Sequence, residues 1–236
     1  MIDLFFTPAG IPEDLDRNRP VLIVDIFRAS TTIAAALAAG AREVLIAGSR
    51  AEAAHLKSLR GGNVLLAGER DGVKIEGYDL GNSPMEMTSE LLAGHTVIFD
   101  STNGTKLARQ FESFEDVAFG SMVSLSASVA FAAQSSLDPL IACAGRLGNF
   151  SGEDALAAGF LVSRLRRERT EMNDAALFAL RLVERSGDSW REWAADSYHG
   201  RYLRSIGYAA DIDFCLTTDR YDFVPIKQDG KFVRGA

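Results

Sequence analysis

Short, strongly apolar runs alternate with segments of helical periodicity along about the first 170 residues. The first run, Val21–Ile26, is rich in β-branched residues and lacks polar alternation, which is typical of a strand covered on both faces. Similar runs predict further strands at Glu43–Ala47, Asn63–Gly68, Thr96–Asp100, Asp116–Gly120 and Pro139–Ala144. The predicted helices are Thr32–Ala41, Arg50–Arg60, Lys106–Phe111, Leu125–Gln134 and Glu153–Arg169.

Strands separated by helices of this length favour right-handed crossovers and parallel pairing. We therefore expect a three-layer α/β/α fold, with a largely parallel or mixed central sheet and helices on both faces. The sequence contains no repeat, no low-complexity tract and no linker rich in proline or serine. These features predict a single domain over residues 1–236.

Two regions break the alternation. The segment from Glu69 to Glu86 is rich in glycine and has little helical periodicity, so it is either a functional loop or a surface hairpin around 73–80. In the C-terminal third, Asn173–Ser186 has the periodicity of an amphipathic helix. Asp211–Leu216 follows as a predicted final strand, antiparallel to the others.

The overall composition narrows the class of protein. Hydrophobic residues make up 47% of the chain and charged residues 24%, as in ordinary soluble globular proteins. The net charge of −7 argues against nucleic acid or an anionic membrane as the main partner. The two cysteines are too few for a disulfide framework, and no apolar run resembles a signal peptide or spans a bilayer. We therefore expect a cytoplasmic protein.

A polar cluster follows the first predicted strand directly. Asp25, Arg28 and Ser30 stand where the strand ends and a helix begins, with Ser30 or Thr31 as the expected N-cap. Ligands bind at this position in open α/β sheets, and free backbone N–H groups there favour anions. The alternative is a local ion pair between Asp25 and Arg28 beside an ordinary cap, and this stretch alone leaves both interpretations open.

Polar residues also follow the third and fourth predicted strands. Glu69 and Arg70 end the third strand, and Lys74 and Asp79 come a little later. The fourth strand leads into DSTNGTK at 100–106, which combines small side chains, exposed N–H groups and one cation. This segment has the chemistry of an anion cradle, although it lacks the spacing of a Walker A motif.

The loop after the sixth predicted strand, residues 143–154, ends at the start of a helix. Ser151 is the expected N-cap, and Glu153 and Asp154 fall in the first helical turn. The two carboxylates either stabilise the helix dipole or hold a hard cation. Mg²⁺ usually binds one or two carboxylates together with water and substrate phosphate. Asp25 is the natural companion if the first and sixth strands end at the same edge of the sheet.

Several nucleophile and metal schemes are excluded by spacing. Asn149 stands six residues after Cys143, where a C-x₅-R phosphatase loop needs arginine, and Phe27 excludes an Asp-x-Asp motif. No G-x-S-x-G elbow and no paired-histidine metal motif occurs. His55 and His95 are expected to be structural, whereas His199 is either an ordinary surface residue or a candidate for the site. The remaining chemistry favours a small phosphorylated anion handled by a metal ion.

The chain resembles the Mg²⁺-dependent 2-phosphosulfolactate phosphatases associated with coenzyme M biosynthesis. The matching blocks, in the family's order, are VDIFRASTTIAAAL (24–37), LLAGERDGVKIEGYDLGNSP (65–84), STNGT (101–105), CAGRLGNFSGED (143–154) and YHGRYLRSIGYAADIDFC (198–215). The resemblance implies hydrolysis of the phosphate ester on the 2-hydroxyl of sulfolactate, or of a related 2-phospho-hydroxycarboxylic acid, with Mg²⁺ as cofactor. The alternative is a non-catalytic binding protein or sensor for a small phosphorylated metabolite.

The resemblance and the polar clusters together give the expected roles of individual residues. The expected metal ligands are Asp25, Glu153 and Asp154. The expected catalytic residues are Asp25, Arg28, Glu69, Lys106 and Asp79, with Glu69 or Asp79 transferring a proton and Asp25 a covalent nucleophile in one variant. The expected substrate-binding residues are Ser30, Thr31, Arg70, Lys74, Asn82, Ser83, Thr102, Asn103, Gly104, Thr105, Gly145 and Arg146.

Among these residues, Arg70, Lys74 and Arg146 are expected to meet the carboxylate and sulfonate of the substrate. One departure from the family pattern is that Val123 and Ser124 stand where an asparagine is expected, which predicts altered substrate selection if that asparagine contacts ligand. The expected partners are the small anionic substrate and a second copy of the chain, because most soluble oligomers are homo-oligomers.

Overall fold

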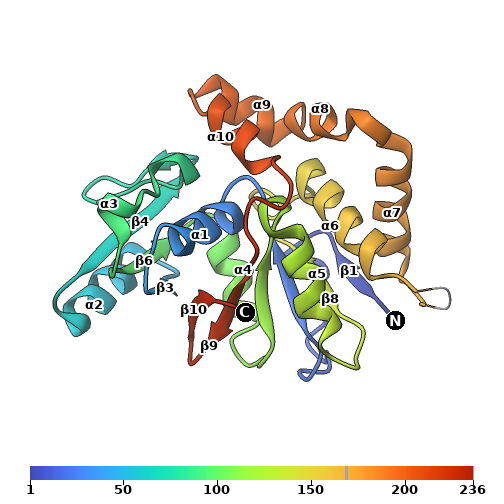
Figure 1. The fold of residues 1–236 in the computed structure, drawn as a ribbon, viewed down its shortest axis with the longest axis horizontal. Helices are drawn as coiled ribbons and strands as arrows, with labels where there is room; N and C mark the ends of the chain where they lie inside the picture. Colours follow the sequence, from blue (N-terminus) through green and yellow to red (C-terminus); the bar gives the residue numbers. More distant parts are fainter. Residues whose placement is uncertain (168–169, 236) are drawn as a thin grey trace.

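A mixed sheet of ten strands runs through the computed structural model, which describes residues 1–167 and 170–235 (Figure 1). The order of the strands across the sheet is β1-β8-β2-β7-β9-β10-β3-β6-β4-β5. Their bounds are β1 (Asp3–Phe5), β2 (Val21–Val24), β3 (Glu43–Ile46), β4 (Val64–Arg70), β5 (Val73–Lys74), β6 (Thr96–Asp100), β7 (Val117–Gly120), β8 (Leu140–Cys143), β9 (Pro225–Gln228) and β10 (Lys231–Arg234).

The sheet consists of two parallel groups joined by a hairpin. β1, β8, β2 and β7 are parallel to one another, and so are β3, β6 and β4. The hairpin β9–β10 lies between the groups and pairs antiparallel with β7 on one side and with β3 on the other. The predicted largely parallel or mixed sheet is therefore confirmed, and all six predicted strands are present.

The helices and 3-10 turns connect these strands. The helices are α1 (Ala29–Ala38), α2 (Arg50–Arg60), α3 (Ser89–Leu92), α4 (Gly104–Gln110), α5 (Leu125–Ala133), α6 (Gly152–Leu165), α7 (Asp174–Ser186), α8 (Trp190–Ala195), α9 (Tyr198–Ser205) and α10 (Ala209–Cys215). The 3-10 turns are η1 (Pro8–Gly10), η2 (Pro84–Glu86), η3 (Met122–Ser124) and η4 (Gly187–Ser189). Helix α6 ends at Leu165, and positions 168–169 of the helix predicted there lie outside the described residues.

Helices cover both faces of the sheet, as the three-layer prediction requires. Alternate residues of β2 point to opposite faces. Leu22 and Val24 belong to one apolar core with α5, α6 and α7. Val21 and Ile23 belong to a second core with α1 and α4. β2 is buried along its whole length, which is why its sequence is a continuous apolar run.

Residues 174–215, from α7 to α10, are helical and lie across the ends of the central strands. From α7 the chain passes through α8 to α9 and α10, which stand above the sheet in Figure 1. The close packing of α6 on α7 requires a glycine, because a Cβ at Gly159 would lie 2.3 Å from the carbonyl oxygen of Ala179. Among the described residues, no helix combines the length and the apolar character needed to cross a membrane.

Two local expectations are corrected by the structure. The strand predicted at Asp211–Leu216 is wrong, because helix α10 occupies it and its buried residues Ile212, Cys215 and Leu216 recur at helical spacing. Neither Ser30 nor Thr31 caps α1, which begins earlier with Arg28 at the N-cap. The hydroxyl of Ser30 instead accepts a hydrogen bond from the backbone N–H of Asp25 at 2.9 Å.

For residues 69–86, the sequence left a functional loop and a surface hairpin as alternatives. The segment does form an edge hairpin, but the hairpin is centred on Asp71 and Gly72, where Glu69 pairs with Lys74 across β4 and β5. The chain then leaves the edge and turns back through η2 toward the sheet centre. This return brings Asn82 and Ser83 into buried positions close to α1 and α10.

Candidate active site

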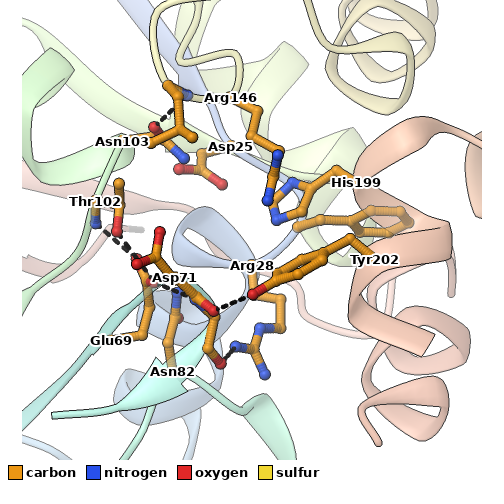
Figure 2. Close-up of a pocket in the computed structure, with 13 residues that line it drawn as sticks. Asp25, Arg28, Glu69, Asp71, Asn82, Thr102, Asn103, Arg146, His199 and Tyr202 are labelled. Atoms are coloured by element: carbon orange, nitrogen blue, oxygen red, sulfur yellow. Dashed lines mark hydrogen bonds between the residues drawn. The ribbon is translucent and has the colours of Figure 1, made fainter. Parts of the chain in front are cut away.

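A pocket lies where the carboxyl ends of strands from both parallel groups approach helix α9 (Figure 2). It is partly open, and the space within and in front of it amounts to about 380 Å³, open solvent included. The lining residues are Asp25, Phe27, Arg28, Glu69, Asp71, Gly72, Asn82, Thr102, Asn103, Arg146, Leu147, His199 and Tyr202. Segments far apart in the sequence therefore converge at one site, as expected for strand ends in an α/β sheet.

Asp25 follows β2 and is 5% exposed. Its Oδ1 accepts a hydrogen bond from the N–H of Ala29 at 3.4 Å, and among the described residues no group donates to its Oδ2. Gly104 leaves room for this oxygen, since a Cβ there would lie 2.7 Å from it. Burial raises the pKa of Asp25 to about 6; His199 opposes this increase, and the charge of Glu69 adds to it.

Asp154 lies behind Asp25 and does not line the pocket. Its Oδ1 accepts from the N–H of Ile26 at 3.0 Å and its Oδ2 from the N–H of Gly145 at 3.1 Å. Burial, together with the charges of Glu153 and Asp25, raises the pKa of Asp154 well above its usual value. This carboxyl therefore joins the end of β2 to the loop after β8.

Glu153 is also buried, at 1% exposure, and does not line the pocket. Its Oε1 accepts hydrogen bonds from the hydroxyl of Ser151 and from Nδ1 of His199, while its Oε2 has no partner among the described residues. Burial raises the pKa of Glu153, but the hydrogen bond and charge of His199, with the bond from Ser151, outweigh burial and bring the pKa below its usual value. Ser151 occupies the predicted N-cap position of α6, but its hydroxyl donates to Glu153 and accepts no capping bond.

Glu69 at the end of β4 organises two segments of the pocket wall. Its Oε1 accepts from the N–H of Thr102 at 2.6 Å, and its Oε2 accepts from the Thr102 hydroxyl and from the N–H of Gly72. Both oxygens are thus engaged by protein donors. This carboxylate fixes the β4–β5 turn against the loop that precedes α4.

Arg28 lines the pocket but is held by the protein. Its guanidinium donates to Asp211 at 2.6 Å and to the carbonyl oxygen of Gly72 at 2.6 Å, and it stacks 4.0 Å from the ring centre of Tyr208. Ser83 donates to the other oxygen of Asp211. The alternative of an ion pair between Asp25 and Arg28 is therefore not observed, since the carboxylate partner of Arg28 comes from α10.

Arg146 is the other guanidinium in the pocket. It lies between two aromatic rings of α9, 5.0 Å from the ring centre of Tyr198 and 4.5 Å from that of Tyr202. Among the described residues, no carboxylate forms an ion pair with it. Its charge is consequently available to an anionic ligand.

Helix α9 supplies His199, for which the sequence left two interpretations open, and Tyr202, which the sequence did not single out. His199 and Tyr202 stand three residues apart, on one face of the helix, and both line the pocket. The Tyr202 hydroxyl donates to the carbonyl oxygen of Asp71 at 2.8 Å and so fastens α9 to the β4–β5 turn. The helical spacing within YHGRYL is the signal that could have indicated this face.

Several predicted site residues lie outside the pocket. Asp79 accepts a hydrogen bond from the N–H of Leu66 and contacts Lys57, and Lys74 is exposed beside the Asp79 carbonyl oxygen. Arg70 donates to both carboxylate oxygens of Asp100. Lys106 is exposed and lines an adjoining hollow, which shares Thr102, Asn103 and Leu147 with the pocket.

Other predicted ligand-binding residues are buried in the surrounding framework. The hydroxyl groups of Thr31, Ser83 and Thr105 donate to protein oxygens, and Ser30 is buried as well. Gly104 leaves space for the carboxylate of Asp25, and the backbone N–H of Gly145 donates to Asp154. Asn82, Thr102 and Asn103 do line the pocket. Val123 and Ser124 are buried away from the pocket, so the departure from the family pattern does not alter its lining.

Comparison with known proteins identifies the class. The model of the 2-phosphosulpholactate phosphatase family matches residues 5–230. A probable 2-phosphosulfolactate phosphatase of Caldanaerobacter subterraneus subsp. tengcongensis is 37% identical over 91% of this chain and 90% of its own length. The probable 2-phosphosulfolactate phosphatase of Thermotoga maritima is 36% identical, over 99% of this chain and 98% of its own. The probable 2-phosphosulfolactate phosphatase of Clostridium acetobutylicum is 30% identical, over 98% of this chain and 99% of its own length.

These matches place the chain among the phosphoric monoester hydrolases, so the prediction of an enzyme of this class is confirmed. The chain belongs to the 2-phosphosulpholactate phosphatase family.

Proposed function

We propose that this pocket hydrolyses the phosphate ester of 2-phosphosulfolactate, or of a closely related 2-phospho-hydroxycarboxylic acid. The observation that carries the proposal is the pairing of Asp25, which has a carboxylate oxygen free of protein donors, with Arg146, which has no carboxylate partner among the described residues. Asp25 is suited to the phosphoryl end of the substrate, through a bound cation. Arg146 is suited to a carboxylate or sulfonate.

A divalent cation fits the donor set. Asp25, Glu69 and Asp71 line the pocket, and the charge of Arg28 is already matched by Asp211. A substrate with three anionic groups therefore needs positive charge beyond Arg146. Among the described residues, no three His, Cys, Asp or Glu side chains form a metal cluster, but Mg²⁺ commonly takes only one or two carboxylates with water and phosphate.

We propose Asp25 as the protein ligand of Mg²⁺, with Glu153 and Asp154 buried behind it and outside the pocket lining. When bound, the ion would neutralise charge on the phosphoryl group and lower the pKa of an attacking water. Glu69 would hold the Thr102 loop in place for the phosphoryl oxygens. Lys106, in the adjoining hollow, would attract the anionic substrate toward the mouth of the pocket.

The proposal is tested by phosphate release from 2-phosphosulfolactate, 2-phospholactate and 2-phosphoglycerate, with Mg²⁺ and with EDTA. We expect release that depends on Mg²⁺ and falls by at least about 100-fold in Asp25→Asn. Asp14→Asn, which removes an exposed carboxylate elsewhere, is the matched control. Binding of these compounds without any release would instead favour the sensor alternative.

Hydrolysis of a chiral, isotope-labelled phosphorothioate analogue of the substrate distinguishes the two forms of attack. Inversion at phosphorus indicates direct attack by water, whereas retention indicates two displacements through a covalent phosphoenzyme on Asp25. The homodimer and the cytoplasmic location expected from the sequence stay predictions. Light scattering of the purified protein measures the first, and cell fractionation measures the second.

A further inference from the structure

His199 forms a buried pair with Glu153 at the edge of the pocket. Its Nδ1 lies 3.0 Å from Oε1 of Glu153, and the side chains are 12% and 1% exposed. A carboxylate oxygen accepts, so Nδ1 is the donor of this pair. Among the described residues, no protein group forms a hydrogen bond with Nε2, and the ring lies beside Asp25 and Arg146 in Figure 2.

Three separate segments fix the position of this ring. Helix α9 carries His199, and the first turn of α6 carries Glu153. The loop after β2 carries Phe27, whose ring packs edge-on against His199 with 6.3 Å between the ring centres. Ser151 donates to the same Oε1, which restrains the carboxylate further. A histidine held at one nitrogen by a buried carboxylate is arranged to exchange a proton at the other nitrogen.

The other candidates for proton transfer are occupied or distant. Glu69 accepts three hydrogen bonds from protein donors, so both of its oxygens are already engaged. Asp79 lies outside the pocket, and the Tyr202 hydroxyl donates to a backbone carbonyl. Among the described histidine, tyrosine and glutamate side chains that line the pocket, His199 is thus the best placed to give a proton.

We propose that His199 is the proton donor to the leaving oxygen of the phosphate ester, and that Glu153 is the positioning residue that orients it. This inference rests on the proposed function. The bond between phosphorus and the substrate oxygen breaks, its electron pair passes to that oxygen, and the proton from Nε2 converts it to the hydroxyl of the product. The attacking water adds its oxygen to phosphorus and releases one proton, which returns to His199 through solvent.

The chemistry of the substrate makes such a donor necessary. The alkoxide of a 2-hydroxy acid is strongly basic and leaves slowly unless it is protonated as the bond breaks. A phenolate that carries a nitro group is a far weaker base and needs no proton. The importance of His199 should therefore increase with the basicity of the leaving group.

The test uses the full-length enzyme with Mg²⁺ and phosphate esters of graded leaving-group acidity, from 2-phosphosulfolactate to 4-nitrophenyl phosphate. We expect His199→Gln to lower kcat on the alkyl ester by about 10²–10⁴-fold and on the nitrophenyl ester by less than about tenfold. Glu153→Gln should show the same dependence with a smaller loss. His55→Gln, an exposed histidine of α2, is the matched control.

An equal loss on both esters would overturn the proposal, because a purely structural defect does not depend on the leaving group. Full activity of His199→Gln on the alkyl ester would overturn it too, while leaving the proposed function intact. If the wild-type enzyme hydrolyses neither ester in Mg²⁺, the proposed function fails, and the role of His199 fails with it. Circular dichroism and thermal melting establish that each variant is folded before its rates are compared.

Discussion

At the scale of single residues, the main feature is a carboxyl group whose burial destabilises its ionised form. Asp25 is buried next to other acidic groups, and its pKa is raised from 3.8 to about 6. In the unfolded chain the same group loses its proton at lower pH. Its burial therefore lowers the free energy of unfolding progressively between about pH 4 and pH 6, and by a constant amount above that range.

We expect Asp25→Asn to be more stable than the wild type when both are free of metal at pH 7.5. A shift of about two pKa units corresponds to about 3 kcal/mol, an upper limit for the gain. The gain should vanish at about pH 3, where the carboxyl is mostly protonated in both states. Urea denaturation in EDTA at the two pH values measures it, and a wild type that is the more stable at pH 7.5 would contradict the explanation.

Site residues at the ends of parallel strands were predictable from the sequence. Asp25, Glu69 and Asn103 follow buried strands directly, and such ends converge in an α/β sheet. Position alone did not distinguish these residues from Lys74 and Asp79, which lie a few residues further on and point away. The orientation of each side chain beyond a strand end depends on turns that apolar periodicity does not encode.

At the scale of elements, the decisive contacts fasten the C-terminal helices to the rest of the molecule. Arg28 and Asp211 are 183 residues apart in the chain and form a buried ion pair, with side chains 1% and 4% exposed. Ser83 adds a third segment through its bond to Asp211. The start of α1, the turn at η2 and helix α10 are thereby held together beside the pocket.

Replacing Asp211 with alanine should destabilise the protein strongly. The change leaves the Arg28 charge buried without its partner, which typically costs about 3–5 kcal/mol. Asp213→Ala removes an exposed carboxylate from the same helix and should change stability by less than about 0.5 kcal/mol. Urea denaturation of both variants measures the difference, and similar midpoints for the two would show that the buried pair does not stabilise the fold.

The elements that sequence patterns missed are those stabilised by distant contacts. Helix α10 contains β-branched and aromatic residues that also suit a strand, and only its packing beneath α9 decides in favour of the helix. His199 and Tyr202 reach the pocket because α9 crosses above the strand ends. Local periodicity contains no information about that crossing.

At the scale of the whole molecule, the hairpin β9–β10 joins the two parallel groups of the sheet. Phe232 of β10 is 4% exposed, and its ring centre lies 4.6 Å from that of Phe119 in β7. The same residue pairs with Val44 of β3. Phe232 thus joins the two halves of the sheet, through its ring on one side and its backbone pairing on the other.

Phe232→Ala should lower the free energy of unfolding by about 3–5 kcal/mol, because it leaves a cavity between the two halves. Phe150→Ala, at a side chain that is 52% exposed, serves as the control and should cost much less. Thermal melting measures both changes. Equal effects at the two positions would contradict the joining role of the hairpin.

The position of this hairpin also has a consequence for biosynthesis. β9 and β10 are the last strands to leave the ribosome, yet they occupy the middle of the strand order. Helices α1 and α4 contact strands of both halves, but the hydrogen-bonded sheet between β7 and β3 cannot be completed until this segment has emerged. The sheet of the nascent chain therefore stays incomplete between β7 and β3 until β9 and β10 have been synthesised.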